Sequence, residues 1–147
     1  MRLEDVICEL FTNDSIYLIE KAIGLLTESD DFSISLPHLL SFLEDEQNLA
    51  FIARYEEEVL GFIYGYSLLS LTSLPQLFIY SVDVFKRYQG LGVGSKLFQY
   101  VVNYARQNGY SESFVITDKR NKPACRIYEK AGGKSYYDDE IVYVIKN

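Results

Sequence analysis

Apolar residues recur along the chain with two spacings, and the longer spacing predicts the helices. Between residues 16 and 26 they recur every three or four positions, which places them on one face of a helix that Asn13 or Asp14 caps. A longer helix with the same spacing ends just before Gly109, a residue that favours the backbone of a helix terminus. We expect about four helices, over residues 13–26, 37–45, 92–107 and 123–131.

Short apolar and aromatic runs predict the strands. The runs Asn48–Tyr55 and Val59–Leu69 are separated only by residues 56–58, so they are expected to form an antiparallel hairpin. A second hairpin is expected near the end of the chain, around Asp138 and Asp139. The strands expected are 7–11, 48–55, 59–69, 76–84, 114–117, 134–137 and 141–145.

The order of these elements predicts the fold class. It indicates an α/β fold with a mixed, mostly antiparallel central sheet of about seven strands, flanked by about four helices. A helix joins strands 76–84 and 114–117, so these two should be parallel with a right-handed connection. The 147 residues contain no linker or repeat, and we interpret residues 1–147 as one domain. Ligands of such sheets bind beyond the carboxyl ends of the strands, here at the turn after residue 84.

Composition excludes several classes of protein. Only Cys8, Cys125 and His38 could act as soft metal ligands, so neither a disulfide framework nor a metal site is expected, and a reducing cytoplasm is the default location. No apolar run approaches the roughly 20 residues of a membrane span, and no signal peptide is evident. The net charge of −7 argues against binding to nucleic acid.

The charges are unevenly distributed along the chain. Residues 1–85 contain 15 acidic and 3 basic residues, whereas residues 86–147 contain 6 acidic and 11 basic residues. The first part should attract cations and the second anions. The alternative is that the acidic residues only solvate exposed helix faces.

A glycine-rich turn follows the strand at residues 76–84. Its backbone N–H groups open a helix, where the helix dipole and free donors favour a phosphate or pyrophosphate, and Lys86, Arg87 and Lys96 add positive charge. The alternative is a plain connection between strand and helix. The glycine spacing matches neither the dinucleotide fingerprint nor the P-loop. The turn comprises Gln89, Gly90, Leu91, Gly92, Val93, Gly94 and Ser95.

Two segments of the chain resemble the landmarks of a known superfamily. Gln89-x-x-Gly92-x-Gly94 is similar to the pyrophosphate loop of the GNAT acetyltransferases. The second landmark is resembled by Asn121-x-x-Ala124-x-x-x-Tyr128-x-Lys130-x-Gly132-Gly133. Phe51–Ala53, Gly61-x-x-x-Gly65-Tyr66 and Ile79–Val84 further resemble the small aminoglycoside 3-N-acetyltransferases. Members of that subgroup tend to carry an acidic residue where this chain has Ser81.

The resemblance implies acetyl-CoA as co-substrate. The backbones of Val82 and Val84 would bind the pantetheine arm, in a strand splayed from its neighbour. Residues 89–95 would hold the pyrophosphate, and Asn121 is also assigned to cofactor binding. Tyr128 aligns with the residue that protonates the departing thiolate, the alternative being a core aromatic.

The acceptor side requires a base, because amines are mostly protonated at pH 7. Asp83 is the candidate base, and the alternative is that it caps the N–H groups of the following turn. Ser81 and Glu140 are assigned to the acceptor site. A carboxylate near the end of an inner strand is costly to bury without a partner, which favours a functional role for Asp83.

The function expected from these observations is transfer of an acetyl group from acetyl-CoA directly to a primary amine. The favoured acceptor is a small cationic molecule such as an aminoglycoside. The alternatives are another small amine, a protein N-terminus, or a non-catalytic sensor of acyl-CoA. A homodimer is one assembly consistent with this expectation.

Overall fold

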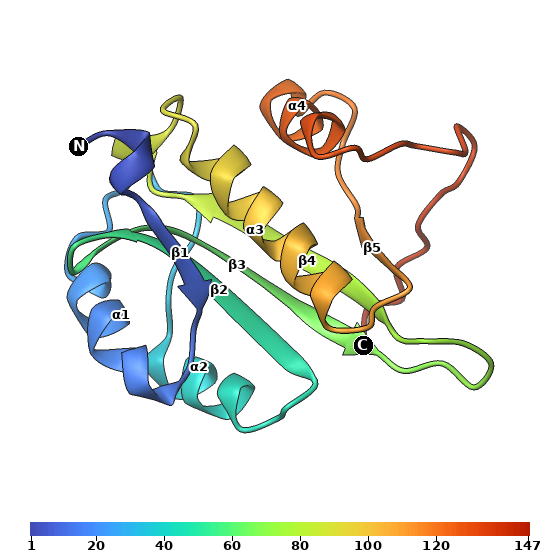
Figure 1. Cartoon of the computed structure of the whole chain (residues 1–147), viewed down its shortest axis with the longest axis horizontal. Coiled ribbons are helices and arrows are strands. Elements are labelled where there is room, and N and C mark those ends of the chain that lie inside the picture. Colours follow the sequence, from blue (N-terminus) through green and yellow to red (C-terminus); the bar gives the residue numbers. More distant parts are fainter.

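A single mixed sheet organises the chain in the computed structural model, which describes all 147 residues (Figure 1). The strand order is β1-β2-β3-β4-β5. Neighbours from β1 to β4 are antiparallel, and β5 is parallel to β4. The predicted hairpin at residues 56–58 and the predicted parallel pair are therefore confirmed. The strands are β1 (Ile7–Leu10), β2 (Asn48–Tyr55), β3 (Glu58–Leu68), β4 (Gln76–Val84) and β5 (Glu112–Val115).

Four α-helices accompany the sheet, as expected. Thr12 begins the first helical segment, because its hydroxyl accepts the N–H of Asp14; the sequence had indicated Asn13 or Asp14 as the cap. No helix combines the length and apolarity that would be needed to cross a membrane. The helices are α1 (Ile16–Ile23), α2 (Leu36–Leu43), α3 (Val93–Gln107) and α4 (Lys122–Lys130), with short 3-10 turns η1 (Leu3–Asp5), η2 (Asn13–Ser15) and η3 (Lys86–Tyr88).

The sheet is covered on both faces, and strand β2 shows how. Phe51 and Ala53 are buried in a core that includes one side of α3, whereas the alternate residues Ala50 and Ile52 are buried in a second core that includes α1. Successive side chains of a strand point to opposite faces, so α3 and α1 lie on opposite sides of the sheet. Figure 1 shows α3 running diagonally across the sheet, with α4 packed beyond its first turns.

The expectation of seven strands was wrong, because the sheet has five. Residues 134–137 and 141–145 adopt no regular structure. Residues 141–145 consist of β-branched and aromatic residues, yet their side chains are 70–86% exposed. A run with strand propensity becomes a strand only where its backbone meets the edge of another strand, and no such pairing forms here.

Close contact between β3 and β4 depends on two glycines in β3. A Cβ on Gly65 would lie closer to the Phe78 carbonyl than real Cβ atoms approach, and one on Gly61 would lie 2.6 Å from the Asp83 carbonyl. Gly65 lies beside the β-bulge that places Tyr64 opposite Ser81. The glycines therefore hold β4 in its position against β3.

Replacement of Gly65 by alanine is expected to lower the free energy of unfolding by about 1–3 kcal/mol, because backbone must move to admit the methyl group. Gly24→Ala is the matched control, since its Cβ would meet only the Lys21 carbonyl, at 3.6 Å. That variant should stay within about 0.5 kcal/mol of the wild type. Urea unfolding of the three proteins measures both effects, and equal midpoints for both variants would contradict the argument.

Candidate functional site

Strands β4 and β5 separate halfway along β4. Their last pair is Ile79 with Val115, whereas β4 continues to Val84 against β3. Residues 81–84 therefore have a partner strand on one side only. The opening expected from the sequence is present at the carboxyl end of β4.

The backbone of this free edge is oriented toward the opening. The Phe85 N–H donates to the Leu60 carbonyl at 3.0 Å. The backbone N–H and C=O groups of Phe85 therefore point toward β3, and by alternation so do those of Asp83. The backbone N–H and C=O groups of Val82 and Val84 then point toward the opening. The Val84 carbonyl accepts a bond of 3.0 Å from Gln89 Nε2, which agrees with this orientation. An extended chain of amide groups could pair with Val82 as a neighbouring strand would.

The glycine-rich turn leads from this edge into α3. Gly90 and Gly92 have positive φ angles of 76° and 88°, and Gly92 is the N-cap of α3. The N–H groups of residues 92–95 have no acceptor within the helix, because the first turn of any helix lacks them. A Cβ on Gly90 would meet nothing within 4 Å, so the surface of the turn is open to a ligand. Free donors and the positive end of the helix dipole suit an anion here.

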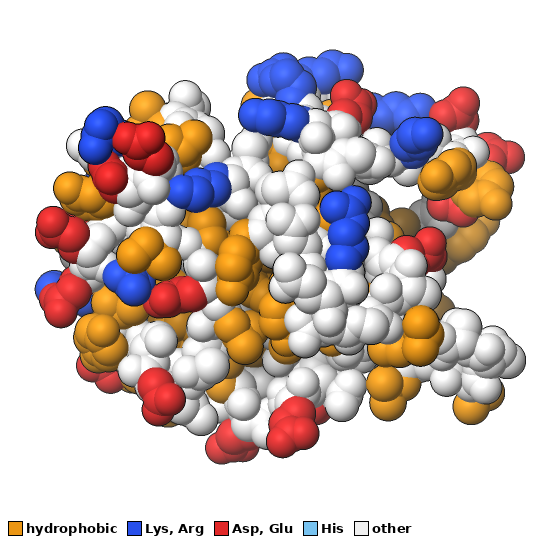
Figure 2. All heavy atoms as spheres, viewed as in Figure 1, with side chains coloured by type: hydrophobic (Ala, Val, Ile, Leu, Met, Phe, Trp, Pro, Cys, Tyr) orange, Lys and Arg blue, Asp and Glu red, His pale blue; other side chains and the backbone are white.

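Two of the three basic residues expected at this turn have structural partners. Lys96 Nζ donates to the carbonyls of Leu3 at 2.8 Å and Val6 at 2.6 Å, and so fixes the N-terminal segment to α3. Arg87 donates to the Leu25 carbonyl at 3.1 Å. Further positive charge comes from α4, where Figure 2 shows basic side chains gathered. The basic residues of α4 itself are Lys122, Arg126 and Lys130.

Asp30 caps the start of the turn, a role that the sequence did not reveal. Its carboxylate accepts the Lys86 N–H at 2.8 Å and the Thr27 N–H at 3.0 Å. These backbone bonds, the Lys86 bond first, lower the pKa of Asp30. Because 56 residues separate Asp30 from Lys86, no local pattern could have indicated the contact.

Tyr128 lies on α4 with its ring against Phe98, the ring centroids being 4.8 Å apart. Burial raises the pKa of Tyr128, and the charges of Asp83 and Cys125 raise it further. The phenol is therefore protonated at neutral pH and able to donate. Gly133 N–H donates to the Tyr128 carbonyl at 2.9 Å and closes the turn that follows the helix.

Asp83 and Ser81 lie together on the sheet face opposite α3. The Ser81 hydroxyl donates to Asp83 Oδ2. Burial raises the pKa of Asp83, and the Ser81 hydrogen bond partly opposes this. No backbone N–H of the following turn donates to Asp83; Asp30 takes that position. The geometry thus gives Asp83 a raised pKa and a fixed orientation but no capping bond.

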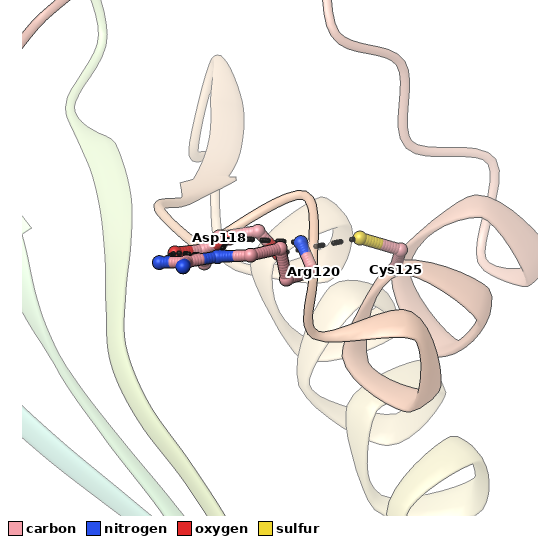
Figure 3. A network of polar contacts seen from close by, with 3 residues as sticks. All are labelled: Asp118, Arg120 and Cys125. Carbon is pink, nitrogen blue, oxygen red and sulfur yellow. Dashed lines mark hydrogen bonds and ion pairs between the residues drawn. The ribbon is translucent and has the colours of Figure 1, made fainter.

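The loop before α4 is held by polar contacts of its own (Figure 3). Asp118 pairs with Arg120 at 2.7 Å, and Cys125 Sγ donates to the Asp118 carbonyl at 3.7 Å. Asn121 Oδ1 accepts the Ala124 N–H at 3.3 Å and so caps α4. The Asn121 oxygen therefore serves the helix, and its assignment to the cofactor stays a prediction.

Glu140 is not brought to the other candidate residues. It lies exposed in the irregular segment after α4, and no hydrogen bond or ion pair joins it to them. The end of β4, the start of α3 and α4 adjoin one another, since a Cβ on Gly94 would contact both Val84 and Ile127. The charge of Asp83 also acts on the Tyr128 phenol. A carboxylate and a protonated phenol are groups able to exchange protons with a ligand.

Comparisons with known proteins agree with this arrangement. Residues 14–133 match the acetyltransferase (GNAT) family. An aminoglycoside acetyltransferase from an uncultured soil metagenomic sample, solved with sisomicin, is 25% identical, with a TM-score of 0.75 over 98% of this chain and 97% of that one. The structure of AAC(6')-Iy with a bisubstrate analogue of CoA is 16% identical, covers 97% and 98% of the two chains, and has a TM-score of 0.72, which shows the fold.

A match to a curated relative covers only part of either chain. "Probable N-acetyltransferase camello" from Xenopus tropicalis is 27% identical over 94 residues, which make up 64% of this chain and 42% of that protein. The chain thus matches less than half of this relative. The family model, in contrast, spans most of the chain, from η2 to the turn after α4. The five-stranded fold, the splayed strand and this match together show that the chain is an acetyltransferase of the GNAT family.

Proposed function

We propose that the chain transfers an acetyl group from acetyl-CoA to a primary amine of a small cationic molecule. The observation that carries this proposal is the opening between β4 and β5, where β4 bears the hydrogen-bonded Ser81–Asp83 pair, together with the effect of the Asp83 charge on Tyr128 of α4. One group is held protonated and the other is a carboxylate with a raised pKa. Transfer to an amine needs both, because an ammonium loses two protons as it becomes an amide, and the departing sulfur must gain one.

The residues at the opening fit acetyl-CoA. Its diphosphate would be held by the N–H groups of residues 89–95, and the amides of its pantetheine arm by the backbone of Val82. The Val84 carbonyl is already bonded to Gln89, so on this strand Val82 offers the free pair of groups. When bound, acetyl-CoA supplies an acetyl group activated as a thioester.

The side chains then divide the proton transfers. Asp83 accepts a proton from the acceptor ammonium, so that the nitrogen lone pair is free to attack. Ser81 holds the carboxylate by donating to Oδ2, and acts as a positioning residue. Tyr128 would donate its phenolic proton to the departing sulfur, and the second proton that the nitrogen loses as the amide forms would restore the phenol. Direct transfer requires no protein nucleophile. Cys125, the cysteine of α4, is not needed as one, and its Sγ donates a hydrogen bond to the Asp118 carbonyl.

The nature of the acceptor is supported by two observations. The soil enzyme was solved with sisomicin, and the first 85 residues of this chain are strongly acidic. An aminoglycoside is therefore the first acceptor to test, ahead of other small amines and protein N-termini. Release of free CoA from acetyl-CoA, measured with aminoglycosides, polyamines, amino acids and peptides, tests the proposal. No release with any amine would leave a non-catalytic sensor of acyl-CoA.

Gly92→Val should weaken acetyl-CoA binding more than tenfold, which is about 1.4 kcal/mol. A β-branched residue disfavours the positive φ at this position, and its Cβ would lie 2.9 Å from Leu3 Cδ2, so the turn must move. Calorimetric titration with acetyl-CoA measures the effect. Gly109→Val, with a similar φ of 80° at the other end of α3, is the control for strain alone and should bind normally. Equal affinity in all three proteins would contradict the role of the turn.

Tyr128→Phe should reduce kcat by about 100-fold or more while changing acetyl-CoA affinity little, because the ring still packs on Phe98 and only the proton donor is lost. Tyr104→Phe is the control, since Tyr104 is another half-buried ring of the same core, 5.1 Å from Phe51. Steady-state thiol release measures both variants. Unchanged kcat in Tyr128→Phe would show that the thiolate is protonated by another group.

Asp83→Asn separates the two roles of this carboxyl. As a base, Asp83 works only when ionised, so kcat/KM of the wild type should rise with pH through the raised pKa of this carboxyl. The Asp83→Asn variant should lose activity at neutral pH. It should regain part of this activity at high pH, where the amine deprotonates unaided. Because the folded-state pKa is raised, the ionised carboxyl costs stability above that pKa, and the variant should be at least as stable as the wild type at pH 7.

A matched variant changes the pKa of Asp83 and leaves the carboxyl in place. Ser81→Ala removes the hydrogen bond that lowers the pKa of Asp83, so the rise in kcat/KM should move to higher pH. Thermal melts and pH–rate profiles of both variants are the measurements. Lower stability of Asp83→Asn at every pH, with an unchanged profile shape, would favour a structural role.

A further inference from the structure

Five aromatic rings contact one another on the sheet face that carries Asp83. Phe78 of β4 and Phe114 of β5 are stacked with their centroids 4.7 Å apart. The Tyr80 ring lies 5.6–5.7 Å from three of the other rings. We call this cluster the aromatic platform; its members are Tyr64, Tyr66, Phe78, Tyr80 and Phe114.

Tyr80 is the exposed member of the platform. It is 57% exposed, whereas the other four are half-buried. The register of β3 and β4 skips it, because Tyr64 pairs with Ser81 and Gly65 with Ile79. It is also the first residue of β4 beyond the last pair with β5. Its ring thus stands at the mouth of the opening, supported by its neighbours and accessible to a ligand.

The distance from Tyr80 to the candidate base is short. Asp83 lies three positions after Tyr80 on β4, and three extended residue steps span at most about 10 Å. The side chains of Tyr80 and Asp83 lie on the same face of the sheet, opposite α3. The Tyr80 ring contacts the Tyr64 ring, and the charge of Asp83 contributes to the raised pKa of Tyr64. A small molecule could therefore reach Asp83 and Tyr80 together.

Asp83 is the only acidic residue of β4, and several acidic residues of other elements have partners of their own. Glu9 pairs with Arg54, Glu57 with Lys21, and Glu58 contacts the Tyr88 hydroxyl. The amine that reacts must give up its proton at Asp83, so its charge is lost as it becomes reactive. Affinity for a cationic acceptor then needs a second contact. The face of a tyrosine ring attracts a cation, because its quadrupole is negative there.

We infer that Tyr80, with the platform behind it, binds a second, non-reacting cationic group of the acceptor. This rests on the proposed function and names the class of acceptor more closely: a molecule with two amino groups no more than about 10 Å apart, one acetylated beside Asp83 and the other held over the Tyr80 ring. Tyr80 is thus a residue that determines specificity, with no part in the proton transfers.

Two acceptors of equal shape test the inference. One is aminohexyl-trimethylammonium, and in the other a tert-butyl group replaces the trimethylammonium, so that only the charge differs. The wild type should show a KM about tenfold lower for the cationic acceptor. Tyr80→Phe keeps the ring and should keep this ratio, whereas Tyr80→Leu should bring it close to one. Tyr17→Leu is the control, because Tyr17 is 56% exposed on α1, away from the platform, and should not alter the ratio.

A binding measurement makes the result independent of turnover. Hexyltrimethylammonium has no amine to acetylate, and calorimetry should show its affinity at least fivefold weaker in Tyr80→Leu than in wild type and Tyr17→Leu. Thermal melts verify that the variants fold. If thiol is released but the ratio persists in Tyr80→Leu, the inference is wrong and the proposed function stands. If no amine releases thiol, the proposed function fails, and calorimetry alone decides whether Tyr80 binds cations.

Discussion

Strand β4 keeps a partner on one side along its whole length but on the other side only as far as Ile79. The remainder of the site depends on this asymmetry. An unpaired edge inside a sheet leaves backbone donors and acceptors without partners, which is costly unless something else binds them. Gln89 binds one of these groups, the Val84 carbonyl. The other groups of the edge are available to a ligand that brings amides of its own.

Keeping such an edge in place requires rigidity on the opposite side. The two glycines of β3 allow its backbone to approach β4 more closely than any side chain would permit. Buried residues of β3 and β4 on the face covered by α3, such as Ile63 and Leu77, add a core that holds the pair together. The opening is therefore a built feature of the sheet, and its walls are pre-organised for a ligand.

The sequence was most informative where structure is local. Alternation and helical spacing located the central strands β2 and β4 to the residue and the four helices to within a few residues, and the glycines of residues 89–95 located the turn before α3. It was wrong where a segment needs a distant partner. Residues 141–145 have strong strand propensity, but no neighbouring edge pairs with them. The Asp30–Lys86 cap and the Lys96 contacts to Leu3 and Val6 likewise join residues far apart in sequence.

The distribution of charge along the sequence likewise does not reveal which charged residues pair with distant partners. The acidic first part of the chain was expected to attract cations, yet several of its carboxylates pair with Arg54, Lys21 or backbone N–H groups. Net charge acts over about a Debye length, roughly 10 Å at 0.1 M salt, and can attract a cation toward this part of the molecule. At contact distance the proposed selection of an amine depends on groups of the sheet face, which include the Asp83 carboxylate and a set of aromatic rings. Under this proposal, long-range attraction and short-range recognition of the amine depend on different residues.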